Sequence, residues 1–225
     1  MSTPVTFRPP RASQSLLPGA DGIRPAGVHV AVEGPIGVGK TTLARVLAGE
    51  LGAEPVLEVV EENPFLLKFY EDIRAYAFQT QIFFFLSRHR QQQAIKAKRQ
   101  AGASVVSDYI FPKDRLFARM NLDDRELDLY DRLFEIVAPT TVAPDLVIYL
   151  QAGVDTLLRR IAHRDRSFER AIERDYLARL CEVYEDFMPS YDEVAVLTVD
   201  TDKVDIFARP DLDEILGFVR EVAPA

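Results

Sequence analysis

Short apolar runs alternate with longer segments of helical periodicity from Val28 to the end of the chain. The apolar runs predict strands at residues 28–32, 56–60, 104–107, 146–150 and 195–199. The periodic segments predict helices at residues 40–51, 64–71, 75–100, 125–137, 154–163, 170–187 and 212–222. Strands that alternate with helices are typical of a parallel sheet with crossover connections. The pattern therefore predicts an α/β fold.

The first 27 residues differ from the rest because they show neither helical nor strand periodicity. Proline and glycine interrupt the segment at Pro4, Pro9, Pro10, Pro18, Pro25, Gly19, Gly22 and Gly27. We interpret residues 1–27 as a flexible tail and residues 28–225 as a single domain. The alternative is a mitochondrial presequence, since arginines outnumber acidic residues here, but the prolines would break the amphipathic helix that such a signal requires.

Composition narrows the class of protein. The chain has 225 residues, 48% of them hydrophobic and 28% charged, which suits one globular domain. Its net charge of −8 disfavours a nucleic-acid partner, because a phosphate backbone is bound through an excess of Lys and Arg. The sequence has one cysteine and neither a secretory signal nor an apolar stretch of about 20 residues, so we expect a cytoplasmic protein without a membrane partner.

The most specific motif is a phosphate-binding loop. Residues 34–41 read Gly-Pro-Ile-Gly-Val-Gly-Lys-Thr and match G-x-x-x-x-G-K-[ST] between a predicted strand and a predicted helix. The glycines allow several backbone N–H groups to point at the phosphates of a nucleoside triphosphate, and the helix N-terminus adds positive potential. We expect the donor to contact Gly34, Gly37, Val38, Gly39, Lys40, Thr41 and Thr42.

A phosphate-binding loop by itself occurs in kinases, GTPases, helicases and other ATPases. The Asn-Lys-x-Asp guanine-binding motif of GTPases is absent from the sequence, and a helicase would be longer and more basic. The sequence therefore favours a kinase that acts on a small molecule.

Two carboxylates fall near the ends of predicted strands. Glu58 lies in the run 56–60 and Asp108 directly follows the run 104–107. Because the carboxyl ends of parallel strands meet at one edge of a sheet, both are expected beside the phosphate-binding loop. There Glu58 could accept a proton from an attacking hydroxyl, and Asp108 could bind Mg²⁺.

The order of several motifs resembles the deoxynucleoside kinase family, especially its bacterial deoxyadenosine and deoxyguanosine kinases. These motifs are the phosphate-binding loop, Glu58-Val-Val-Glu-Glu-Asn-Pro-Phe, Phe69-Tyr70, the segment 78–88, Ser107-Asp108 with Asp114, and the segment 158–169. The resemblance covers about residues 28–199. It implies a doubly wound five-stranded parallel sheet, a homodimer formed through long helices, and transfer of a γ-phosphate to the 5′-hydroxyl of a deoxynucleoside.

The resemblance also assigns site residues. Glu58 is similar to the family's general base, although Val59 replaces the proline that follows it in the family, and Glu61 and Glu62 are nearby competitors. The remaining matches are Tyr70 and Glu169 for the sugar 3′-hydroxyl, and Gln81, Arg88 and Asp114 for the base. Gln81 and Arg88 are seven residues apart and would share a helix face, with Phe78 and Phe85 as aromatic walls.

Five arginines between residues 159 and 170 predict a lid that binds phosphates. Guanidinium groups can bridge the oxygens over which charge spreads during phosphoryl transfer. The family pattern selects Arg160, Arg164 and Arg166 for this role and leaves Arg159 and Arg170 on the surface. The alternative is a solvated helix face whose arginines pair with Glu169 and Glu173.

The sequence departs from the family directly after Asp108, where most relatives carry an arginine and this chain has Tyr109. A phenol cannot supply the missing positive charge. We therefore expect another cation, Arg115 or a lid arginine, to take its place.

These observations predict a Mg²⁺-dependent deoxynucleoside kinase that uses ATP or another nucleoside triphosphate. Mg²⁺ is expected at Thr41, Glu58 and Asp108, and purine deoxynucleosides or deoxycytidine are expected to be better acceptors than thymidine. The alternatives are a nucleoside monophosphate kinase of the thymidylate kinase type and a non-catalytic module that binds a nucleotide.

Overall fold

The computed structural model describes residues 4–11 and 27–222 and centres on a six-stranded sheet. Its strands lie in the order β1-β6-β5-β2-β4-β3. They are β1 (Val5–Arg8), β2 (His29–Glu33), β3 (Glu54–Val56), β4 (Val105–Ser107), β5 (Leu146–Gln151) and β6 (Ala195–Asp200). Strands β2 to β6 pair in parallel, and β1 pairs antiparallel with β6.

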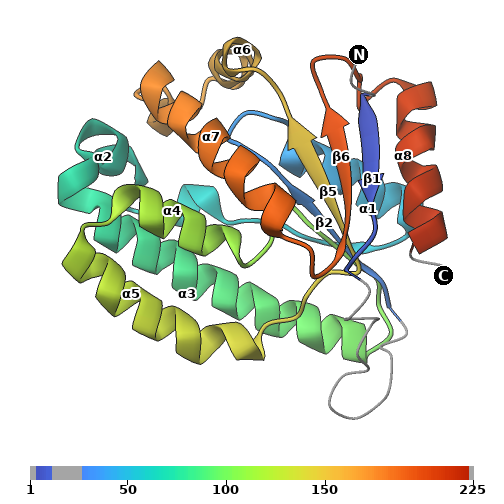
Figure 1. The fold of residues 1–225 in the computed structure, drawn as a ribbon, viewed down its shortest axis with the longest axis horizontal. Coiled ribbons are helices and arrows are strands. Elements are labelled where there is room, and N and C mark those ends of the chain that lie inside the picture. Colours follow the sequence, from blue (N-terminus) through green and yellow to red (C-terminus); the bar gives the residue numbers. More distant parts are fainter. Residues whose placement is uncertain (1–3, 12–26, 223–225) are drawn as a thin grey trace.

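Helices connect the strands and cover both faces of the sheet (Figure 1). They are α1 (Lys40–Leu51), α2 (Leu66–Glu71), α3 (Ile73–Gln100), α4 (Lys113–Asn121), α5 (Asp124–Val137), α6 (Val154–Arg164), α7 (Arg174–Ser190) and α8 (Arg209–Val222). In Figure 1, α7 passes in front of the sheet, whereas α1 lies behind it. This doubly wound α/β arrangement confirms the predicted fold class.

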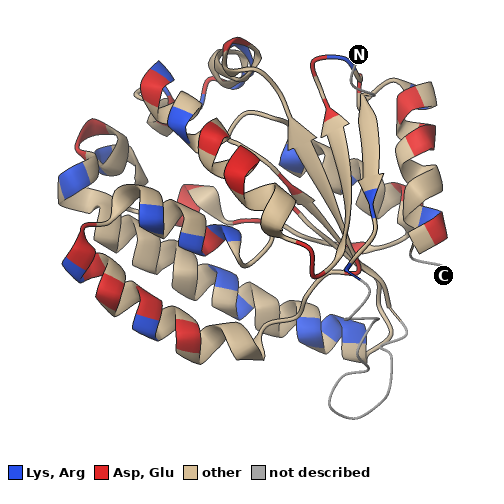
Figure 2. Cartoon of the chain, viewed as in Figure 1, with Lys and Arg blue, Asp and Glu red and all other residues tan. Residues whose placement is uncertain are grey.

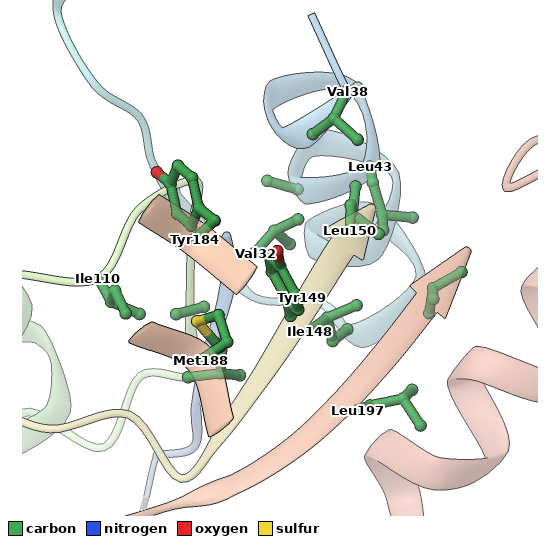
Figure 3. Close-up of a cluster of buried hydrophobic side chains, with 14 of the residues drawn as sticks. Val32, Val38, Leu43, Ile110, Ile148, Tyr149, Leu150, Tyr184, Met188 and Leu197 are labelled. Atoms are coloured by element: carbon green, nitrogen blue, oxygen red, sulfur yellow. The ribbon is translucent and has the colours of Figure 1, made fainter. Parts of the chain in front are cut away.

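The core lies between the sheet and its covering helices. All five residues of β2 are buried, as are the first five residues of β5, which explains the apolar runs 30–32 and 146–150 within them. Figure 3 shows how side chains from several elements meet in this core. Tyr149 of β5 and Tyr184 of α7 stack there with ring centroids 6.1 Å apart.

The sheet topology explains the position of the candidate site. The chain leaves β2 for α1, and its parallel neighbours are β4 on one side and β5 on the other. Ligands of open α/β sheets bind at the carboxyl ends of the strands where the strand order reverses. The phosphate-binding loop follows β2 and therefore lies at this point.

Three expectations from the sequence need correction. Residues 5–8 form β1 rather than part of a flexible tail, so the sheet has six strands, not five, and one strand is antiparallel. The rest of the predicted tail, 1–3 and 12–26, lies outside the described residues.

The second strand spans Glu54–Val56 rather than 56–60, because the chain turns into a 3₁₀ segment, Val60–Glu62, soon after it. Helix α4 was not predicted, although Pro112 at its N-terminus is a common start signal.

Charged residues are interspersed along the helices in the view of Figure 2. Basic residues Lys98 and Arg99 lie in the last turn of α3, where they complement the helix dipole. Among the described helices, none combines the length and the apolar character that a membrane crossing requires.

Candidate active site

The phosphate-binding loop adopts a backbone that only glycine adopts readily. Gly34, Gly37 and Gly39 have φ angles of 145°, 86° and 109°, and a Cβ on Gly34 would lie 2.4 Å from the carbonyl oxygen of Leu150. The Nζ of Lys40 donates to the carbonyl oxygens of Gly34 and Pro35 at 2.7 and 2.9 Å. The ammonium of Lys40 is thus held by carbonyl oxygens of the loop itself. Val38 is buried, and Thr42 lies on the exposed side of α1.

Asp108 joins the loop to the acceptor side of the site. Its Oδ2 accepts a hydrogen bond from Thr41 Oγ1 at 2.5 Å, and its Oδ1 accepts one from the backbone N–H of Glu58 at 2.7 Å. Asp108 directly follows β4, as the sequence predicted, and its side chain is buried. A single carboxylate thus holds the start of α1 and the segment after β3 together.

Glu33 is a supporting residue that the sequence analysis missed. Its Oε1 accepts from the N–H of Gly34 at 2.7 Å and from Tyr184 Oη at 2.9 Å, and its Oε2 accepts from the N–H of Ile110 at 2.9 Å. The side chain is fully buried at the end of β2. A carboxylate that closes an apolar strand was the available signal, because a buried charge requires partners.

Glu58 lies between two cations. Arg88 Nε donates to its Oε1 at 2.7 Å, Arg88 Nη2 donates to the same oxygen, and Lys113 Nζ donates to its Oε2 at 3.1 Å. Burial alone would raise the pKa of Glu58, but the positive charges of Arg88 and Lys113 outweigh it and lower the pKa to about 2. The carboxylate is therefore ionised at neutral pH.

At Lys40, the effects that lower the pKa outweigh the nearby carboxylates that raise it. Burial, followed by the positive charge of Lys113, lowers the pKa of Lys40 to about 8, while Glu33, Glu58 and Asp108 act in the other direction. The ammonium form therefore still predominates at neutral pH and is lost as the pH rises through about 8. A triphosphate bound in the loop would stabilise the charged form.

The two other competitors for the role of base lie elsewhere. Glu61 has an exposed side chain that pairs with Arg166 at 3.2 Å, and Glu62 is exposed. Neither contributes to the cavity that Glu58 lines. The structure therefore favours Glu58 among the three carboxylates.

The three residues predicted to read the base form one connected group. Gln81 Nε2 donates to the backbone oxygen of Asp114 at 2.9 Å and also to its carboxylate, which in turn accepts from Arg88. Tyr130 Oη adds a further bond to Asp114 at 2.6 Å. Asp114 is fully buried and lies behind the described cavity wall, so it anchors Gln81 and Arg88 rather than facing the cavity itself.

The aromatic walls differ from those predicted. Phe85 packs with Phe111 and Tyr130 in a separate core cluster, and Phe78 does not line the cavity. Phe84 lines it instead, with the Arg88 guanidinium 4.9 Å from its ring centroid. The helical spacing correctly placed Gln81 and Arg88 on one face of the helix. The aromatic residue that lies between them on this face is Phe84, not Phe85.

One cavity extends from the phosphate-binding loop past Glu58 to Gln81 and Arg88. The loop residues Gly37, Lys40 and Thr41 line one part of it, and Gln81 and Arg88, which were predicted to read the base, line another. The predicted phosphate and base positions therefore share one enclosed space with Glu58.

The predicted sugar-binding pair also lines this cavity. Tyr70 packs edge-on against Tyr176, and Glu169 is buried in the 3₁₀ turn Ser167–Glu169. Arg164 Nε donates to Glu169 at 3.0 Å, and Arg166 lies 3.9 Å from the same carboxylate. Two arginines that were predicted to form the lid thus contact a residue that was predicted to bind the sugar.

The structure separates the five arginines of this segment, and Arg160 does not line the cavity with the other two that were predicted to do so. Arg164 and Arg166 line the cavity, whereas Arg170 is exposed and pairs with Asp165, and Arg159 is exposed and donates to Thr156. Arg160 lies outside the wall formed by the described residues. It donates to the carbonyl oxygen of Val38 at 3.2 Å, which places it against the phosphate-binding loop.

The expected replacement for the missing arginine is wrong in one respect. Arg115 pairs with Asp131 at 2.8 Å and covers the ring of Phe134, so it faces α5 and not the cavity. Lys113, two residues earlier on α4, contacts Glu58 instead. The sequence analysis missed Lys113 because α4 was not predicted, and without that helix the direction of the side chain was unknown.

The donor set of Thr41 and Asp108 fits Mg²⁺, which prefers oxygen ligands and shares them with substrate phosphates. Their oxygens are adjacent, at 2.5 Å, beside the phosphate-binding loop. Glu58 was also predicted as a ligand, but both of its oxygens contact cations. Within the described residues no group of three or more His, Cys, Asp and Glu side chains forms an all-protein metal site.

The doubly wound sheet, the phosphate-binding loop and the adjoining acceptor cavity define a P-loop phosphotransferase. The profile of the family described as Deoxynucleoside kinase matches residues 30–223. The chain belongs to this family and is a deoxynucleoside kinase, which confirms the resemblance seen in the sequence.

Individual relatives agree with this assignment. The chain is 36% identical over 199 residues to the Deoxyguanosine kinase of Bacillus subtilis (strain 168), covering 86% of this chain and 96% of the relative. It is 32% identical over 207 residues to the Deoxyadenosine/deoxycytidine kinase of the same organism, covering 88% and 93%. A solved structure of deoxyadenosine kinase from M. mycoides with the products dCMP and a flexible dCDP bound has a TM-score of 0.77 at 27% identity, covering 86% of this chain and 100% of that chain.

Proposed function

We propose that this kinase transfers the γ-phosphate of ATP to the 5′-hydroxyl of a deoxynucleoside, with Glu58 as the general base. The observation that supports this most directly is the position of Glu58, in one cavity with Lys40 and Arg88. A carboxylate placed between a phosphate-binding lysine and a base-reading arginine can accept the proton of the attacking hydroxyl. Its low pKa keeps it ionised at neutral pH.

On the donor side, Lys40 binds the phosphates and the loop N–H groups surround them. Thr41 and Asp108 would hold Mg²⁺, which bridges phosphate oxygens and neutralises charge when bound. Arg164 and Arg166 line the cavity from the lid and would contact the transferring phosphoryl group. Arg160 supports the loop through Val38.

On the acceptor side, Tyr70 and Glu169 are placed to bind the sugar 3′-hydroxyl. Gln81 and Arg88 would read the base, held in position by Asp114. Because its Nε2 is used by Asp114, Gln81 presents its amide oxygen as an acceptor, which suits the amino groups of adenine and cytosine. We propose that purine deoxynucleosides and deoxycytidine are preferred to thymidine, as the names of the relatives from Bacillus subtilis (strain 168) support.

A cytoplasmic location is part of this proposal, because the phosphate donor is made and used inside the cell.

We also propose a homodimer formed through α5. Leu129, Leu133 and Ile136 recur at helical spacing on that helix, with exposed fractions of 50%, 36% and 72%. Light scattering should show that Ile136→Asp lowers the molar mass to that of a monomer, while Phe207→Asp, which changes another exposed apolar residue, leaves the mass of the parent.

The role of Glu58 is tested by Glu58→Gln, which keeps the shape of the side chain and removes the base. We expect kcat to fall by about 10²-fold or more. Glu61→Gln and Glu62→Gln are matched controls on neighbouring carboxylates and should keep kcat near that of the parent. If Glu58→Gln retains kcat while one of these controls loses it, the assignment of the base is wrong.

A further inference from the structure

Lys113 brings a second buried ammonium group into the cavity, from the acceptor side. Its side chain is 3% exposed and lines the cavity, although it lies on α4, far in sequence from the phosphate-binding loop. A buried cation is costly unless it has partners, so its position demands an explanation. Its ammonium carries three donors, and among the described residues its hydrogen bond is to Glu58.

The two oxygens of Glu58 are held differently. Oε1 accepts from both Nε and Nη2 of Arg88, whose third nitrogen is fixed by Asp114. Oε2 accepts from Lys113 at 3.1 Å. Arg88 holds Oε1 with two hydrogen bonds, whereas Oε2 has a single hydrogen bond, from Lys113. Oε2 is therefore the oxygen that can exchange this bond for one from the hydroxyl of an acceptor.

Lys113 and Lys40 approach the same space from two directions. Lys40 follows the phosphate-binding loop and is bound to its carbonyl oxygens, whereas Lys113 comes from α4 and lies 5.9 Å from the ring centroid of Tyr109. Both side chains line the same cavity, together with Glu58. A path for a transferred phosphoryl group between them would be flanked by positive charge on both sides.

We propose that Lys113 is a catalytic residue that donates hydrogen bonds to the attacking 5′-oxygen and to the transferring phosphoryl group. The inference rests on the proposed role of Glu58. In the step, the 5′-oxygen forms a bond to the γ-phosphorus, the bond from that phosphorus to the bridging oxygen of ATP breaks, and Oε2 of Glu58 takes the hydroxyl proton. Lys113 keeps its protons and stabilises the charge that develops on the oxygens.

Steady-state kinetics of three variants test the proposal. Lys113→Met keeps the length of the side chain and removes its charge, so kcat should fall by about 10²-fold, with KM for ATP and for the deoxynucleoside changed by less than about threefold. Lys113→Arg keeps a cation and should recover at least about tenfold of that loss. Arg115→Met, on the same helix but facing Asp131, is the matched control and should keep the kcat of the parent.

Chemical rescue separates catalysis from packing. In Lys113→Ala, ethylammonium should raise kcat by about tenfold over the same concentration of sodium, because it returns an ammonium to the space left by the side chain. No rescue in a variant with the thermal midpoint of the parent would assign Lys113 to packing and overturn the proposal. So would a kcat for Lys113→Met within threefold of the parent, or a loss seen only in KM for ATP. Glu58→Gln, assayed in parallel, distinguishes this failure from failure of the proposed base.

Discussion

Arg88 and Glu58 are joined by two hydrogen bonds, from Nε at 2.7 Å and from Nη2, both to Oε1 of the carboxylate. The residue predicted to read the base therefore also orients the proposed general base. The same guanidinium contacts Asp114 through its remaining nitrogen. In the proposed mechanism, recognition of the acceptor and activation of its hydroxyl therefore both depend on this one buried cation.

This relationship predicts a double defect in Arg88→Met. The change should lower kcat about tenfold or more, because Glu58 loses its fixed orientation, and it should also reduce the preference against thymidine. The ratio of kcat/KM between deoxyadenosine and thymidine measures the second effect. Arg90→Met, which removes an exposed arginine from the same helix, should change neither quantity. An Arg88→Met variant with the full preference of the parent would show that the arginine does not read the base.

The lowered pKa of Lys40 predicts an alkaline limit to activity. Because the pKa is lowered to about 8, the free enzyme loses the ammonium proton as the pH rises through that value, and kcat/KM for ATP should fall at higher pH. The charges that set this pKa besides burial are Lys113, Glu33, Glu58 and Asp108. Glu58, with its pKa lowered to about 2, stays ionised throughout the neutral range. Lys40→Arg keeps its charge at high pH and should abolish the alkaline fall, even if its overall rate is lower.

The loop backbone predicts opposite effects for two glycines. Gly34→Ala should lower the free energy of unfolding by about 1–3 kcal/mol and abolish donor binding, because Gly34 has a positive φ and its Cβ would lie 2.4 Å from Leu150 O. Gly49→Ala, inside α1 and with open space around its Cβ, should raise stability by about 0.5–1 kcal/mol. Urea denaturation measures both effects. Equal stability of the two variants would contradict the account of the loop.

The N-terminal strand predicts a stabilising role for Arg8. Its guanidinium donates to the carbonyl oxygens of Pro189, Met188 and Tyr191 at 2.5, 2.6 and 2.8 Å, at the end of α7. Arg8→Met should therefore lower the free energy of unfolding by about 1–3 kcal/mol. Arg11→Met is the matched control, since the Arg11 side chain is 81% exposed and pairs with Asp192 at 3.4 Å. Indistinguishable urea midpoints for the two variants would contradict the claim that contacts between β1 and the end of α7 stabilise the protein.

Most of the fold could be predicted because buried parallel strands appear as short apolar runs, whereas the crossover helices show apolar residues at helical spacing. The prediction failed where short segments depend on distant partners. Strand β1 pairs with β6 near the opposite end of the chain, and the prolines of the N-terminal segment gave no sign of that pairing. Helix α4 is nine residues long, and the direction of Lys113 followed only from its packing.

The candidate site was predictable where a motif fixes local geometry, as for Lys40 and Thr41 in the phosphate-binding loop. Residues that act through tertiary contacts were harder to assign. Glu33 closes a buried strand and holds Gly34, and Phe84 replaces Phe85 as an aromatic wall because the latter packs on Tyr130. A helical spacing identifies a shared face, but the neighbouring elements decide which residue faces the ligand.

The most direct test of the account is a coupled assay of the parent enzyme with ATP, Mg²⁺ and each of the four deoxynucleosides, with their 5′-monophosphates as controls. The account predicts 5′-monophosphate formation from deoxyadenosine, deoxyguanosine or deoxycytidine, a kcat/KM for thymidine about 10²-fold or more below the best of these, and no turnover of the monophosphates. Thymidine turnover equal to that of the best purine, or phosphorylation of the monophosphates instead, would contradict it.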